Sequence, residues 1–130
     1  MAYASSGFIW DNVLRHGLTF RIYGEFVNAE ILPKTSNSLD ILNDFRNGTK
    51  NISIRAKANL EQIVPYTSPT FIGFPIKVPD VYHASEFLKE LSENEKTGNF
   101  PNFTIMLLPG DHTLGTRPGF QVLLKRAHLV

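Results

Sequence analysis

The stretch from residue 79 to residue 108 constrains the fold more than any other part of the chain, because a helical pattern runs directly into an apolar strand. Four apolar residues recur at helical spacing and would form one buried face: Ala84, Phe87, Leu88 and Leu91. Gly98 is predicted to end this helix. Residues 102–108 are almost continuously apolar, as expected of a strand covered on both faces. This order is typical of α/β proteins with parallel strands.

A second strand is predicted at residues 18–23, after a short helix capped by Ser6. Short helices are also expected at residues 39–45 and 56–64. The connection between residues 23 and 105 is long enough for helical crossovers. We therefore expect residues 19–23 and 105–108 to form parallel strands of one sheet, with Glu25 and Asp111 at the same edge.

Length and composition limit the chain to one domain with a hydrophobic core, because its 130 residues are 42% hydrophobic. The net charge of +1 indicates no basic field, so no nucleic-acid partner is expected. The absence of cysteine excludes disulfides, cysteine–zinc sites and thiol nucleophiles. No uncharged run reaches the roughly 20 apolar residues of a membrane span, and the N-terminus has no signal-peptide pattern.

The turn after the apolar strand concentrates polar side chains at residues 109–119. Asp111 and His112 are residue types that ligate zinc or manganese, and Arg117 suits phosphate oxygens. A plain Pro-Gly-Asp turn with an exposed histidine also fits this pattern. Glu25, after the first strand, is either a carboxylate that orients a ligand or a solvated side chain.

The other histidines lie away from further ligand types, and His16 and His83 are expected at the surface or at helix caps. His128 lies in a basic tail without a partner in the sequence. No phosphate-binding loop, dinucleotide fingerprint or serine nucleophile elbow is present.

Three segments, residues 6–26, 78–82 and 101–120, resemble in the same order bacterial phosphoesterases of the alkaline phosphatase superfamily, in the phosphoesterase and phospholipase C-like group. The most specific segment reads Pro-Asn-Phe-Thr-Ile-Met-Leu-Leu-Pro-Gly-Asp-His-Thr-Leu-Gly-Thr-Arg-Pro-Gly-Phe. On this resemblance, residues 1–120 are a central fragment of a phosphoesterase domain and residues 121–130 are a divergent C-terminal tail.

The resemblance implies a partial α/β/α sandwich with a mainly parallel sheet, in which two divalent metal ions promote hydrolysis of a phosphate ester. It implies that Asp111 and His112 are ligands or close neighbours of one ion, zinc or manganese. Glu25, Thr113 and Arg117 would contact the substrate or support the ligands. The family also suggests an exported or periplasmic location.

Two hypotheses follow. The first is a fragment of a metal-dependent phosphoesterase that is inactive alone, because the family's nucleophile and its other Asp and His ligands have no counterpart here. Its exposed sheet edges would favour self-association. The second is a small non-enzymatic α/β module that binds an anion or a protein partner through residues 109–119.

Overall fold

The computed structural model of the chain describes residues 5–111, and of Asp111 only the backbone. The predicted site residues His112, Thr113 and Arg117 lie outside this range, as do the predicted boundary at residue 120 and the tail at residues 121–130. The described part is a mixed α/β structure with two small sheets.

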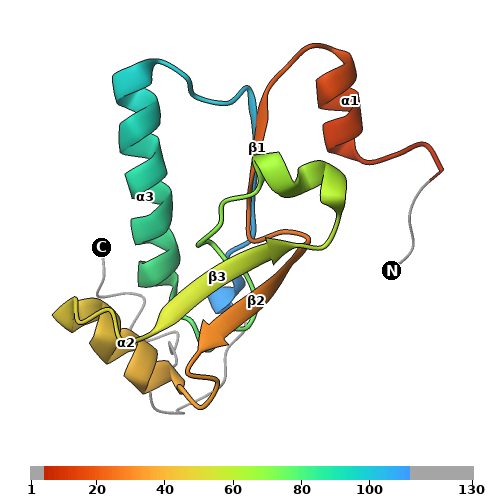
Figure 1. The fold of residues 1–130 in the computed structure, drawn as a ribbon. Helices are drawn as coiled ribbons and strands as arrows, with labels where there is room; N and C mark the ends of the chain where they lie inside the picture. Colours follow the sequence, from red (N-terminus) through yellow and green to blue (C-terminus); the bar gives the residue numbers. More distant parts are fainter. Residues whose placement is uncertain (1–4, 112–130) are drawn as a thin grey trace.

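The first sheet pairs β1 (Phe20–Tyr23) with β4 (Phe103–Met106) in parallel, with Phe20 opposite Phe103 and Tyr23 opposite Met106. The predicted parallel pairing is therefore confirmed. Figure 1 shows this pair in the middle of the molecule, with α3 (Asp80–Thr97) along one side and α1 (Ile9–Arg15) on the other.

The second sheet pairs β2 (Val27–Leu32) with β3 (Ser53–Ala58) antiparallel, and α2 (Ser38–Asn47) connects the two strands. The helix predicted at residues 56–64 is wrong. Buried Ile54 and half-buried Ala56 and Ala58 alternate with exposed neighbours, which is the period of a strand. The 3₁₀ helix η1 (Glu61–Tyr66) follows.

The helix ends follow local chemistry. The Asn37 side chain accepts hydrogen bonds at the start of α2, and Gly48 ends that helix in the left-handed conformation. Gly98 ends α3 in the same way, as predicted. Helix α1 follows Phe8 instead of the predicted cap Ser6, because the Asp11 carboxylate accepts the Phe8 backbone N–H at 2.6 Å.

The hydrophobic core consists of two clusters of buried side chains. One joins β2, β3, α2 and the chain before α3, and the other joins α1, β1 and η1. Their buried members are Ile31, Ile41, Ile54, Ile72 and Val78 in the first cluster, and Trp10, Phe20, Ile22 and Ile63 in the second.

Helix α3 is turned differently from the sequence prediction. Ala84 and Leu88 are exposed, Leu88 to 57%. The inward face carries buried His83, half-buried Phe87 and the half-buried carboxylate of Glu90. The prediction holds for half-buried Phe87 and Leu91 and is wrong for Ala84 and Leu88, because hydropathy alone does not reveal that Glu90 bonds to β1.

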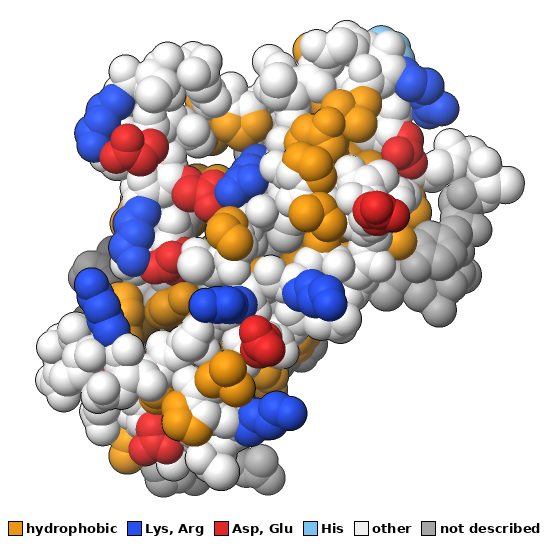
Figure 2. Space-filling model, viewed as in Figure 1, with side chains coloured by type: hydrophobic (Ala, Val, Ile, Leu, Met, Phe, Trp, Pro, Cys, Tyr) orange, Lys and Arg blue, Asp and Glu red, His pale blue; other side chains and the backbone are white. Residues whose placement is uncertain are grey.

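No helix within residues 5–111 is long and apolar enough to cross a membrane. On the face shown in Figure 2, acidic and basic side chains of the described residues lie interspersed. Along α3 they include the ion pairs Glu86–Lys89 and Glu93–Lys96.

The turn after β1 touches the chain at residue 73 so closely that neither glycine tolerates a side chain. Gly24 has φ +81° and Gly73 has φ +60°. A Cβ added to Gly24 would lie 2.7 Å from the Cα of Gly73, and one added to Gly73 would overlap the Gly24 carbonyl.

We expect Gly24→Ala and Gly73→Ala each to lower the free energy of unfolding by about 2–4 kcal/mol, through left-handed strain plus overlap. Gly48→Ala is the matched control: its φ is +63°, but nothing lies within 4 Å of the added Cβ. It should cost about 1 kcal/mol. Equal costs for all three variants in urea unfolding would contradict the close approach.

Candidate functional site at the carboxyl ends of β1 and β4

The two parallel strands end at the same edge, and their following turns meet there. The Leu107 N–H donates to the Tyr23 carbonyl at 2.9 Å, which extends the pairing beyond β4. A pocket of about 350 Å³ opens at this edge. It is lined by Gly24, Glu25, Phe26, Val27, Asn59, Phe74 and Leu107.

Glu25 lines this pocket and is half-buried. It forms no side-chain hydrogen bond or ion pair with another residue of the described part. The backbone of Asp111 ends the short helix η2 (Pro109–Asp111), which follows β4 at the same edge. The parallel pairing places the starts of both turns at this edge of the sheet.

Asp80 and His83 form a second polar group beside this edge, at the start of α3. The expectation of a surface or capping histidine is wrong for His83, whose side chain is completely buried. Its ring lies 4.8 Å from that of Phe71, and its Nδ1 lies 3.5 Å from Asp80 Oδ1. An Asp-x-x-His spacing in a helix was the signal that could have found the pair.

The polar atoms of this pair are poorly satisfied. His83 Nδ1 and Nε2 and Asp80 Oδ1 are buried without a hydrogen bond to the described residues. Burial lowers the pKa of His83, against the opposing effect of Asp80, so the imidazole is neutral at pH 7. Each such orphaned group costs about 1–3 kcal/mol.

The Asp80 carboxylate also lies directly against the turn that follows β4. A Cβ added to Gly110 would overlap the Asp80 side chain. The glycine therefore permits the close approach of the η2 backbone to α3. Because Asp111 is the next residue, α3 and the predicted ligand turn come together at this point.

Sequence reasoning also missed a hydrogen-bonded group around Glu90. Arg21 donates to both of its carboxylate oxygens, at 2.8 and 2.9 Å. Tyr23 Oη donates at 3.1 Å and Ser68 Oγ at 2.5 Å. The carboxylate thus ties α3 to β1 and to the chain that follows η1.

This arrangement fixes the charge states of its members. Burial alone would raise the pKa of Glu90, but hydrogen bonds from Arg21 and Ser68 and the Arg21 charge outweigh it, so the pKa is lowered. Burial and the Glu90 charge raise the pKa of Tyr23 to about 12. Glu90 is therefore a fully bonded carboxylate that holds structure, not a free base.

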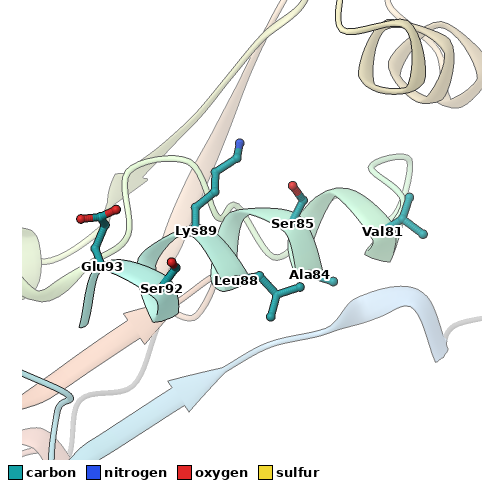
Figure 3. Close-up of a pocket in the computed structure, with 7 residues that line it drawn as sticks. All are labelled: Val81, Ala84, Ser85, Leu88, Lys89, Ser92 and Glu93. Atoms are coloured by element: carbon teal, nitrogen blue, oxygen red, sulfur yellow. The ribbon is translucent and has the colours of Figure 1, made fainter. Parts of the chain in front are cut away.

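Two hollows flank α3. One, of about 830 Å³, lies between α3 and β1 and includes Arg21 and Glu90 in its wall. The other, of about 690 Å³, follows the outer face of the helix. Figure 3 shows Ala84 and Leu88 of this outer face on the opposite side of the helix from Lys89.

The side chains described within residues 5–111 include no group of three or more His, Cys, Asp or Glu residues that could hold a metal ion. Asp80 and His83 are one pair. The predicted ligand His112 and the side chain of Asp111 lie outside the described part.

We expect Glu90→Gln to lower the free energy of unfolding at pH 7 by about 1–3 kcal/mol, because Arg21 loses its charged partner. The pKa of Glu90 is lower in the folded than in the unfolded state. The stability that its carboxylate contributes is therefore fully present above the unfolded-state pKa of about 4.3. It is lost as pH falls through the folded-state pKa. The difference from wild type should therefore narrow below about pH 4.

The matched control is Glu93→Gln, which removes an exposed carboxylate paired only with Lys96. It should change stability by at most about 0.5 kcal/mol. Chemical denaturation between pH 3 and pH 8 measures both variants. A Glu90→Gln protein as stable as wild type at pH 7 would show that the carboxylate does not hold α3.

Comparison of the chain with protein-family models, with curated proteins and with solved structures finds no match. The fold itself is a mixed α/β structure with a parallel pair and an antiparallel pair.

Proposed function

We propose that this chain is a segment of a metal-dependent phosphoesterase of alkaline phosphatase-like α/β/α architecture, in which the turn after β4 supplies metal ligands. The observation that carries the proposal is the parallel pairing of β1 and β4, whose following turns meet at one edge. In α/β proteins, sites are built at the carboxyl ends of parallel strands. Asp111 and His112 follow β4 along the chain, five and six residues after its last residue.

The unpaired edge of the sheet supports a larger architecture. Within residues 5–111, β4 pairs only with β1, and β1 carries on its other side only one bridge, from Ile22 to Thr67. Purely parallel sheets usually have several strands and are covered on both faces. Further strands beside β4 would complete such a sheet.

The outer face of α3 supports the same proposal. Val81, Ala84 and Leu88 line a hollow of about 690 Å³ on this face and are exposed. A helix with apolar residues on its outer side as well as its inner side usually has neighbours on both. A strand edge left unpaired by residues 5–111 and an exposed apolar helix face also favour self-association of the isolated chain.

The proposed roles follow from the chemistry of the side chains. Asp111 and His112 bind one zinc or manganese ion, which stabilises charge on a phosphate ester undergoing hydrolysis. Arg117 and Thr113 contact phosphate oxygens. Glu25, in the pocket between the two turns, orients a ligand or bound water. A hydroxyl nucleophile and the remaining ligands come from segments outside this chain.

The second candidate is a small module that binds an anion through residues 109–119 without a metal. Inorganic phosphate distinguishes the two candidates when it is titrated with and without Zn²⁺. The phosphoesterase proposal expects phosphate to bind only after the metal. Equal binding without metal, lost in Arg117→Ala, would favour the anion-binding module.

We expect Asp111→Asn and His112→Ala each to weaken Zn²⁺ binding to the chain by about 10–100-fold, because each removes one ligand. Both should leave the melting temperature within about 2 °C of wild type, since a turn residue packs few apolar neighbours. Calorimetric titration and thermal unfolding measure the two effects. Unchanged zinc binding in both variants would contradict the metal-ligand assignment.

The genomic DNA on both sides of the coding region provides an independent test. The proposal expects segments that carry the nucleophile and further Asp and His ligands, upstream and downstream, in the same or a neighbouring frame. Flanking DNA that encodes only unrelated proteins would contradict the phosphoesterase proposal.

A further inference from the structure

Asp80 and His83 combine three features of a metal-binding pair. They are three residues apart in α3, so both side chains leave the same side of the helix. Helices that bind metals use the same spacing in a carboxylate-x-x-His pattern. The His83 side chain is completely buried, and neither of its nitrogens has a hydrogen-bond partner in the described part of the chain.

The distance between the two side chains fits a shared ion better than a hydrogen bond. His83 Nδ1 and Asp80 Oδ1 are 3.5 Å apart, beyond the roughly 2.7–3.2 Å of an N–H···O bond. Two atoms that each lie about 2.1 Å from a tetrahedral zinc ion are about 3.4 Å apart. The observed separation is close to this value.

Other buried polar atoms also lack partners, but they do not converge. Trp10 Nε1 and Thr104 Oγ1 are single atoms on separate elements. At α3, by contrast, a carboxylate oxygen and a ring nitrogen without hydrogen bonds face each other.

The geometry points to a divalent-cation site in which Asp80 Oδ1 and His83 Nδ1 are two of the ligands. This inference rests on the proposed function and extends it, because it brings two ligands from α3 to the turn that carries Asp111 and His112.

The position of the pair supports this extension. Gly110 lies against the Asp80 carboxylate, so Asp111 follows immediately after the point of contact.

The test is titration of the full 130-residue chain with Zn²⁺ alone, while the imidazole ¹⁵N resonances are followed by NMR. We expect the His83 ring resonances to shift at saturation, because metal binding changes the shielding of the ligating nitrogen. We expect Asp80→Asn to weaken zinc binding by about 10–100-fold. His16→Ala, which removes an exposed histidine, is the control and should bind zinc as wild type does.

His83→Phe removes both nitrogens and keeps a ring beside Phe71, and it should weaken zinc binding at least as much as Asp80→Asn. If this variant fails to fold, the His83 ring shifts in the wild-type protein and the Asp80→Asn affinity decide the question. Unmoved His83 resonances at zinc saturation would overturn the inference, as would full affinity in Asp80→Asn.

The zinc titrations distinguish an error in the proposed function from an error in this inference. If Asp111→Asn and His112→Ala lose zinc while His83 does not respond, the turn binds metal and the α3 pair does not. If His83 responds and Asp80→Asn loses affinity while the turn variants bind normally, the α3 pair is a metal site and the assignment of Asp111 and His112 is wrong.

Discussion

The Glu90 carboxylate is the interaction on which the placement of α3 depends. Its partners come from two other parts of the chain: Arg21 and Tyr23 from β1, and Ser68 from the segment after η1. Glu86 adds a second polar connection, since it accepts a hydrogen bond from Thr70 at 2.6 Å. These contacts are directional, so they set the rotation of the helix about its axis as well as its distance from β1.

This rotation decides which residues reach the edge of the parallel sheet. With Glu90 turned toward β1, His83 lies two turns earlier on the same inward side and packs on Phe71. Asp80, one turn before it, meets the backbone at Gly110. A charge pair near the middle of α3 therefore positions the polar residues at the start of the helix, beside the turn after β4.

The sequence predicted the parts of the fold that local pattern determines. The strands around Ile22 and Ile105 were found because β-forming residues lie between clear turn signals, and their parallel order followed from the helix between them. The β2–β3 pair was missed because Ala29, Ala56 and Ala58 supply little hydrophobic contrast. Its register depends on pairing between residues 21 to 31 positions apart, which no local window contains.

The candidate site was only partly predictable for the same reason. Glu25 and Asp111 were predicted at one edge of the sheet because each follows a recognisable strand within a few residues. The burial of His83 depends on the rotation of α3. Hydropathy predicted a buried face of Ala84, Phe87, Leu88 and Leu91, of which Ala84 and Leu88 are exposed. The bidentate bond between Arg21 and Glu90 overrides that preference, and it joins residues 69 positions apart.

The rotation of α3 turns carboxylates inward and leaves apolar side chains exposed on the opposite face. A helix at the surface of a small domain normally buries its apolar stripe and exposes its carboxylates. Here Glu86 and Glu90 face inward and are bonded, while Val81 and Leu88 remain uncovered. Its inner face is held by these polar contacts together with the packing of Phe87 on Tyr23 of β1. An element packed on the outer stripe, such as the further layer of the proposed α/β/α domain, would bury that apolar surface without disturbing the bonds that orient Asp80 and His83.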